Sequence, residues 1–234
     1  KLYFVSKNAA NTYELWAYDD TNSTASLLVG LTGSSYYKES IVFNDKLYFE
    51  INSPSYGSEL FVFDDSMQTL ELVQDMQAGT TSSYPQDLYI FNNRLYFRAH
   101  DNSQFFLYTF DGTTITKVTD NASGDTPLRQ TATYGEFNNE LYFSASPLSD
   151  SNNKELWKLD ATGLEMELVT DINVGATGSD PRFFATYKDK LYFSAAGDTH
   201  GHELWSFDGT NTELVHDLST SENIDGYPSY LKVL

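Results

Sequence analysis

The stretch Leu95-Tyr96-Phe97 decides the fold, because the same triplet recurs along the whole chain. The five copies are Leu2-Tyr3-Phe4, Leu47-Tyr48-Phe49, Leu95-Tyr96-Phe97, Leu141-Tyr142-Phe143 and Leu191-Tyr192-Phe193. They divide the chain into repeats 1–45, 46–93, 94–139, 140–189 and 190–234. A period of this length is typical of arrays in which each repeat is one small structural unit. The sequence therefore predicts one domain over residues 1–234, with nothing left over for another.

Each repeat is predicted to form four short antiparallel strands. In the repeat around residue 95 these are residues 86–91, 95–99, 105–110 and 115–119. Asn92-Asn93 and Asp111-Gly112 lie between strands, and such pairs tolerate the positive φ of tight hairpins. In Leu95-Tyr96-Phe97 the Leu and Phe side chains share one face of the strand, and the Tyr takes the other. Four-stranded repeats of 40 to 50 residues are typical of propeller blades, so we expect an all-β, five-bladed propeller.

The ends of the chain predict how the ring closes. Residues 2–4 match a second strand, and Pro228–Leu234 matches a first strand. We therefore expect the C-terminal strand to pair with the N-terminal strand and the two termini to lie within roughly 10 Å of each other. The alternative, five repeats cut from a longer array, stays open. Since the chain starts at Lys1, we expect it to be a processed or excised piece.

Composition excludes several classes of function. The chain has 14 Lys and Arg against 33 Asp and Glu, a formal net charge of −19, which repels nucleic acid. It has no cysteine, which excludes disulfides and thiolate metal sites. No apolar run approaches membrane-span length, so we expect no membrane insertion.

One repeat carries a recognisable motif. Glu203-Leu204-Trp205-Ser206-Phe207-Asp208-Gly209-Thr210 matches ELWxxDGT in full, and Glu14–Thr21 and Glu155–Thr162 are degenerate copies. The chain thus resembles the ELWxxDGT repeat family over its whole length. The resemblance implies a β-propeller from a bacterial surface or secreted protein, hence an extracellular or cell-surface location, and little chemistry. Five-bladed propellers also include sugar-binding proteins of the tachylectin type, which is an analogy at the level of the fold.

Three repeated positions are more simply explained by structure than by function. The third-strand aromatic residues should pack one sheet against the next. The glutamates two residues before them should accept hydrogen bonds from backbone N–H groups of a neighbouring loop. The aspartates should form hairpin turns. The three series are Trp16, Phe61, Tyr108, Trp157 and Trp205; Glu14, Glu59, Glu155 and Glu203; and Asp19, Asp64, Asp111, Asp160 and Asp208.

Metals are a weaker expectation. A second series, Asp75, Asp120, Asp171 and Asp217, ends the fourth strands but lacks the alternating ligand spacing of a known calcium loop. His200-Gly201-His202-Glu203 belongs to the repeat frame, which leaves only His202 as an extra ligand for zinc. We therefore predict no cofactor and no metal site, with calcium kept as an alternative.

The crossovers between repeats are rich in Tyr, Ser, Gly and Asp, a composition that suits polar and stacking recognition of sugars and is also ordinary loop chemistry. The predicted function is a non-catalytic extracellular binding module, carbohydrate-binding or adhesive, whose partner is a glycan or cell-surface polysaccharide. Multiple weak sites would give avidity. The candidate ligand-binding residues are Tyr36, Tyr84, Asp180, His200, His202 and Tyr227.

Two alternatives stay open. A structural spacer of a larger surface protein would bind protein partners through one face. A glycosidase would need two carboxylates facing each other in the central funnel. The carboxylates available on first strands are Glu39, Asp87, Glu136 and Asp180. No catalytic motif surrounds them, so we do not predict an enzyme.

Overall fold

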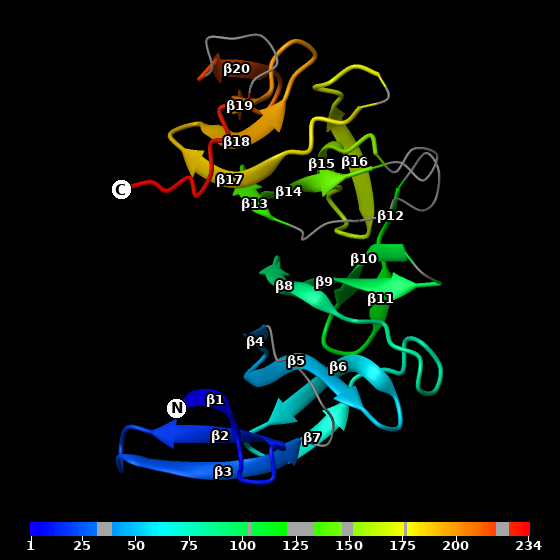
Figure 1. Ribbon diagram of the computed structural model, residues 1–234, viewed down its shortest axis with the longest axis vertical. Coiled ribbons are helices and arrows are strands. Elements are labelled where there is room, and N and C mark those ends of the chain that lie inside the picture. The colour runs from blue at the N-terminus through cyan, green and yellow to red at the C-terminus, as the bar shows by residue number, and fades with distance from the viewer. Residues whose placement is uncertain (32–38, 103, 121–132, 147–151, 176, 219–224) are drawn as a thin grey trace. The chain divides into compact units, whose positions relative to one another are not determined.

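The computed structural model describes residues 1–31, 39–102, 104–120, 133–146, 152–175, 177–218 and 225–234. These residues form five consecutive β-sheets (Figure 1). The first sheet contains β1 (Leu2–Lys7), β2 (Tyr13–Asp19) and β3 (Thr24–Leu31). The second contains β4 (Ser40–Phe43), β5 (Lys46–Ser53), β6 (Gly57–Asp64) and β7 (Thr69–Leu72). The third contains β8 (Gln86–Phe91), β9 (Arg94–Asp101), β10 (Gln104–Phe110) and β11 (Ile115–Lys117).

The last two sheets follow the same order. The fourth contains β13 (Gly135–Phe137), β14 (Glu140–Ala145), β15 (Glu155–Leu159) and β16 (Glu165–Thr170), and β12 (Thr119–Asp120) joins it. The fifth contains β17 (Arg182–Tyr187), β18 (Lys190–Ala196), β19 (His202–Phe207) and β20 (Thr212–His216). Successive strands within a sheet are antiparallel neighbours, which makes the chain all-β and consistent with a propeller-like fold.

The repeated triplet forms the second strand of every sheet. Leu95 and Phe97 have no exposed surface, and Tyr96 is also buried, so both faces of β9 are covered. Burial of both faces is expected where sheets pack face to face. The predicted tight turns are confirmed, because Asn92 and Asn93 both have positive φ, at 45° and 58°. The predicted core role of the third-strand aromatics is confirmed for three residues, since Phe61, Tyr108 and Trp157 are buried.

The fourth strand of the third repeat differs from the prediction. Residues 115–119 do not form one strand, because β11 ends at Lys117. Thr119 and Asp120 instead pair in parallel with Glu165 and Met166 of β16, so the chain passes to the next sheet two residues earlier than expected. Val118 lies between the two short strands and is fully buried. Its backbone N–H still donates to the carbonyl of Leu107 in β10 at 2.9 Å, whereas the N–H of Thr119 donates to the carbonyl of Leu164, next to β16, at 3.2 Å.

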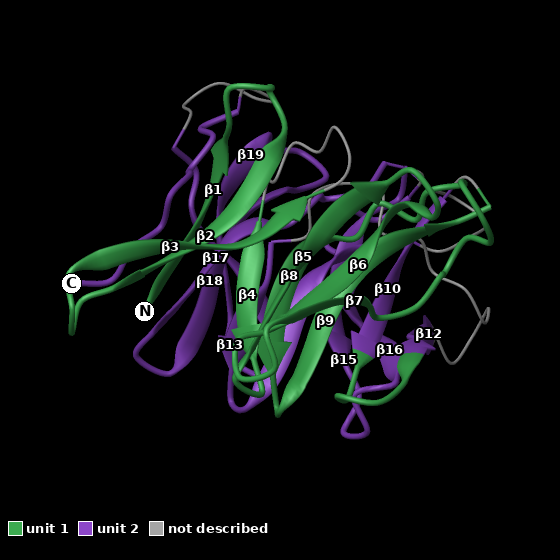
Figure 2. Ribbon diagram, turned by 90° about the horizontal axis from the view of Figure 1, so that it is seen from below, with its two compact units in different colours: residues 1–103, 110–115 green, residues 104–109, 116–234 purple. Residues whose placement is uncertain are grey.

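The chain divides into two compact units (Figure 2). Unit 1 comprises residues 1–103 and 110–115, and unit 2 comprises residues 104–109 and 116–234. In unit 1 the first two sheets share a core that includes Leu15, Phe49 and Phe61. In unit 2 the last two sheets share a core that includes Phe137, Leu156 and Phe193.

First strands of neighbouring sheets also meet within each unit. Glu39, just before β4, accepts a hydrogen bond from the backbone N–H of Leu88 in β8 at 2.8 Å. Thr186 of β17 donates to the carbonyl of Glu136 in β13. Contact between first strands is what neighbouring propeller blades make at their inner edges.

The predicted ring closure is not seen among the described residues. Pro228–Leu234 forms no strand, and β1 pairs with β2 alone, which leaves the first sheet with three strands. The C-terminal pairing, the spacing of the termini and the single-domain boundary 1–234 therefore stay predictions. In the described part of the chain, no helix has the length and apolar character to cross a membrane.

Candidate functional site

The repeated aspartates form turns, as predicted. In the β10–β11 turn, one carboxylate oxygen of Asp111 accepts hydrogen bonds from the backbone N–H groups of Thr113 and Thr114, at 2.9 Å each. The hydroxyl of Thr113 donates to the same oxygen at 2.7 Å and is the main reason that the pKa of Asp111 falls to about 2. Such carboxylates are occupied by their own turns and offer little to a ligand.

Three repeated glutamates each hold a crossover loop, and we call Glu59, Glu155 and Glu203 the clasp glutamates. All three are buried. Glu155 accepts hydrogen bonds from the backbone N–H groups of Ile172 at 2.8 Å and Ser179 at 2.9 Å, and from the Ser179 hydroxyl. These contacts confirm the predicted structural role of the glutamate series at these positions. A buried carboxylate is stable only where such donors are present.

The other two clasp glutamates make equivalent contacts. Glu59 accepts from the N–H and hydroxyl of Ser83 at 3.1 and 2.6 Å. Glu203 accepts from the N–H groups of Leu218 at 2.7 Å and Gly226 at 2.9 Å. Burial raises the pKa of Glu59 and of Glu155, because the charged carboxylate is poorly solvated at these positions.

Each clasp glutamate accepts a hydrogen bond from one crossover residue, and the residue directly after that one is also held in place. Tyr84, Asp180 and Tyr227 occupy the same repeat position, just before a proline, with φ of 51°, 48° and 46°. The backbone N–H of each donates to a carbonyl next to the clasp glutamate: that of Ser58, Lys154 or His202, at 3.0 Å in all three. We call this repeated arrangement the crossover frame. In two of the three frames the side chains of the paired residues also meet, Asp180 with Lys154 and Tyr227 with His202.

In the fifth sheet the crossover frame presents an aromatic ring. The Tyr227 ring stacks on the His202 ring, with centroids 5.8 Å apart and planes 16° apart. Asp225 accepts a hydrogen bond from the backbone N–H of His202 at 2.6 Å, and the nearby Tyr227 hydroxyl is the main cause that lowers the pKa of the Asp225 carboxyl. We call Tyr227, His202 and Asp225 the Tyr227 platform. The Tyr227 ring is held at one face by the His202 ring, yet Tyr227 keeps 66% of its surface exposed.

Charged groups lie next to the Tyr227 platform. Asp180 forms ion pairs with Arg182 and with Lys154, the latter at 3.6 Å. Burial lowers the pKa of His202 first, and the positive charge of Arg182 lowers it further. Both effects favour the neutral form of the His202 imidazole, which has one donor and one acceptor nitrogen. The structure thus brings His202 and Tyr227 together. Asp180 is linked to them through its ion-pair partner Arg182, whose charge acts on both.

The other predicted site residues lie elsewhere. Nδ1 of His200 lies 3.2 Å from a carboxylate oxygen of Asp217, and His200 is two residues before His202 of the platform. Tyr84 belongs to unit 1, where its ring meets the edge of the His100 ring at 5.6 Å and 83°. Tyr36 lies outside the described residues.

Sequence reasoning missed Arg182, Lys154 and Asp225. Arg182 could have been found from the sequence, because it lies only two residues after Asp180, which was a predicted site residue. Lys154 precedes a clasp glutamate, at the position that His202 occupies in the next repeat. Asp225 carried no repeated signal.

The funnel carboxylates of the glycosidase alternative have other partners. Asp87 forms a buried ion pair with Arg98, and Asp180 is paired as described above. Glu39 accepts the Leu88 N–H. These are the contacts of three of the four first-strand carboxylates, and the prediction of a non-catalytic chain stays a prediction. Among the residues that the structure describes, no group of three or more His, Asp or Glu is arranged to hold a metal ion.

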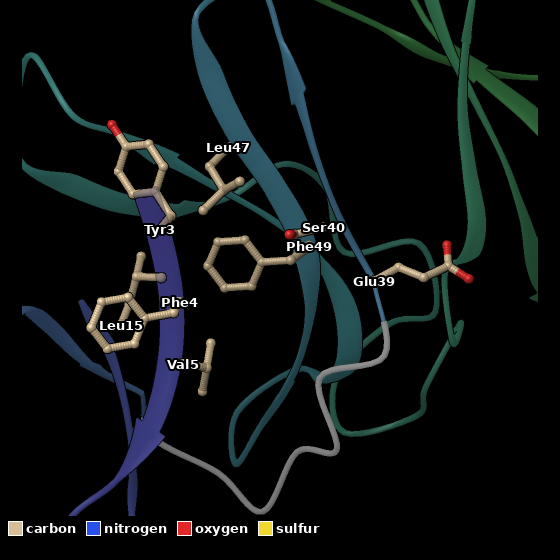
Figure 3. A pocket seen from close by; sticks show the side chains of 8 residues that line it. All are labelled: Tyr3, Phe4, Val5, Leu15, Glu39, Ser40, Leu47 and Phe49. Carbon is tan, nitrogen blue, oxygen red and sulfur yellow. The ribbon is translucent and has the colours of Figure 1, made fainter. Parts of the chain in front are cut away.

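A pocket of about 290 Å³ lies in unit 1, along the edge of β1 (Figure 3). It is lined by Tyr3, Phe4, Val5, Leu15, Glu39, Ser40, Leu47 and Phe49. Figure 3 shows Glu39 directed away from the rings. Six of the eight lining residues are apolar or aromatic, and Glu39 and Ser40 add polar atoms to the lining.

Comparison with known proteins identifies no family. No family model matches the sequence, and no curated protein matches it. Among solved structures the chain is similar to TolB from Acinetobacter baumannii, with 12% sequence identity and a TM-score of 0.48. The match covers 94% of this chain and 54% of that TolB chain, so this chain spans about half the length of TolB. A likeness this distant carries no argument about function.

Proposed function

We propose that this chain is a non-catalytic binding module that recognises carbohydrate at the Tyr227 platform. The observation that supports it is a tyrosine ring that is exposed yet held at two points: the backbone N–H of its own residue and one face of the ring. The apolar CH face of a sugar ring suits a flat aromatic surface, and an aromatic side chain fixed before binding loses little conformational entropy.

The polar neighbours suit sugar hydroxyl groups. Asp180 offers carboxylate oxygens, while Arg182 and Lys154 offer N–H donors within the same group of side chains. A sugar hydroxyl group both donates and accepts hydrogen bonds, so it can donate to the Asp180 carboxylate and accept from Arg182 or Lys154. Sites of this kind combine an apolar surface with a few placed polar groups.

The crossover frame supports a binding role over a catalytic one. The backbone contacts are constant from sheet to sheet, while the presented residues change from Tyr84 to Asp180 to Tyr227. A constant frame with variable side chains is how binding loops are commonly built on a rigid scaffold. The sites would be unequal, and several weak ones together would give avidity for a multivalent glycan.

Three further features belong to this proposal. The chain is a member of the ELWxxDGT repeat family, acts outside the cell or at its surface, and closes into a five-bladed ring. Pairing of Pro228–Leu234 with β1 would supply the strand that the first sheet lacks and would cover the pocket along the β1 edge. Leu2 and Phe4 of β1 are 65% and 39% exposed, which a paired strand would reduce.

A glycan array tests the function. The chain is applied with calcium and again with chelator, alongside Tyr227→Ala and the control Tyr187→Ala, which removes another exposed tyrosine at the far end of β17. We expect calcium-independent binding that Tyr227→Ala abolishes and Tyr187→Ala keeps. Silence under both conditions would contradict the proposal and favour the spacer alternative. Binding lost with chelator would instead point to the aspartates that end the fourth strands.

A further inference from the structure

A second aromatic contact includes Tyr230, an exposed residue three positions beyond Tyr227. The ring of Tyr230 lies against that of Phe183, with centroids 5.7 Å apart and planes 35° apart. Tyr230 keeps 82% of its surface exposed, so contact with Phe183 covers only a small part of it. Sequence reasoning did not single out either residue.

Two chain connections tie this pair to the platform. Tyr230 follows Tyr227 after Pro228 and Ser229, and Phe183 directly follows Arg182, whose charge acts on both Tyr227 and His202. Three residues of extended chain span at most about 10 Å. The two tyrosines therefore lie close enough for one extended ligand, and they are separate side chains with separate supports, His202 and Phe183.

We propose that Tyr230 and Phe183 form a second subsite, and that the ligand is a neutral oligosaccharide of two or more rings that stacks on Tyr227 and Tyr230 together. This inference rests on the proposed function of the Tyr227 platform and specifies the ligand length. A second sugar ring that stacks on Tyr230 adds binding free energy to the first contact. The ligand loses its translational freedom only once.

The charge of the chain favours a neutral ligand. A net charge of −19 repels a polyanionic polysaccharide. Near the platform, Asp180 and Asp225 offset Arg182 and Lys154, so no surplus of positive charge is left to attract one.

Calorimetry with ligands of increasing length tests the subsite. The probes are glucose, cellobiose and cellotriose, together with one-, two- and three-ring fragments of the strongest array ligand. The chain is compared with Tyr230→Ala and with Tyr230→Phe, which keeps the ring. Because Tyr230 is 82% exposed, neither variant should disturb folding.

We expect the best three-ring fragment to bind about tenfold more tightly than its single ring, in line with one added aromatic contact. Tyr230→Ala should remove this gain and leave binding of the single ring unchanged, and Tyr230→Phe should restore the gain. Equal affinity for one and three rings, or a gain that survives Tyr230→Ala, would overturn the subsite while leaving the Tyr227 platform intact. Failure of every fragment to bind would overturn the proposed function itself.

Discussion

Glu155 shows how a single buried carboxylate organises a loop. It is 2% exposed and accepts three hydrogen bonds from Ile172 and Ser179. Without it, these donors would be left without an acceptor in a dry environment, and unpaired buried donors are costly. The clasp glutamates are therefore structural residues that position the neighbouring crossover residue.

Replacement of Glu155 tests this role. Glu155→Ala should lower the free energy of unfolding by about 3 kcal/mol, because it leaves three donors without an acceptor. Glu155→Gln should cost less, since it keeps one acceptor oxygen. The control Glu167→Ala removes an exposed carboxylate of β16 and should change stability by less than about 0.5 kcal/mol. Denaturant unfolding measures all three, and equal losses for Glu155→Ala and Glu167→Ala would contradict the clasp.

The pH profile of the same variants gives an independent check. Burial raises the pKa of Glu155 above its usual 4.5, so the folded chain binds this proton more tightly than the unfolded chain does. The stability that this group contributes is therefore greatest below pH 4.5 and falls as the pH rises through the folded pKa. Unfolding of the natural chain relative to Glu155→Gln should show this decline, and a rise with pH would contradict it.

Repetition explains which residue roles could be predicted. The roles of Asp111 and Glu155 followed from the sequence, since a position that recurs in the same strand context calls for a common structural cause. The stack of Tyr227 on His202 could not be predicted in the same way. These residues are 25 positions apart, and their contact depends on the path of the crossover.

At the level of the element, the segment that leads to Tyr227 depends on Gly226, which packs closely against Leu218 and Glu203. A Cβ at this position would lie 2.6 Å from the Cβ of Leu218 and 2.7 Å from Oε2 of Glu203. Both distances are shorter than side chains tolerate, so the loop would have to move away from its clasp glutamate. Tyr227 is the next residue and would move with it.

Gly226→Ala should therefore lower stability by about 2 kcal/mol and weaken glycan binding together. Gly30→Ala in β3 is a matched control, because a Cβ there meets nothing within 4 Å. Its effect on stability should be small, and binding should be unchanged. Chemical denaturation and array binding measure both properties. A Gly226→Ala chain that keeps full stability would show that the crossover is not packed as described.

For the whole molecule, the repeat predicted the number and order of the sheets. It did not predict which strands lie at the edges of the first and fourth sheets. The pattern of Leu-Tyr-Phe triplets and turns predicted five consecutive sheets, and the structure contains five. The shift of Thr119 and Asp120 to the fourth sheet was not predicted, because it depends on pairing with Glu165 and Met166, more than 40 residues later in the chain. Pairing of the two chain ends depends on how the sheets are arranged in space, which a local pattern does not specify.

The proposed closure predicts a specific pairing. In the second sheet Val42 is the partner of Leu47, so by the repeat Val233 should be the partner of Leu2. Partners in an antiparallel pair have Cα atoms about 5 Å apart, close enough for a disulfide. Because the chain has no cysteine, a Leu2→Cys/Val233→Cys variant has only this pair to oxidise.

We expect this variant to form an intramolecular disulfide in mild oxidant, with an increase in stability of up to about 5 kcal/mol from the large loop that it closes. Non-reducing electrophoresis and thermal unfolding measure the two effects. A variant that stays reduced, or that forms only disulfide-linked dimers, would contradict closure within one chain.

The most direct test of the carbohydrate site is an NMR titration of the histidine side chains with the strongest array ligand. The chain has four histidines, so their ring signals are few enough to assign. Since His202 supports the Tyr227 ring, we predict that saccharide shifts the His202 signals, leaves those of His216 unchanged, and has no effect on either in Tyr227→Ala. Saccharide binding without a shift at His202, or with a shift at His100 alone, would contradict a site at the Tyr227 platform.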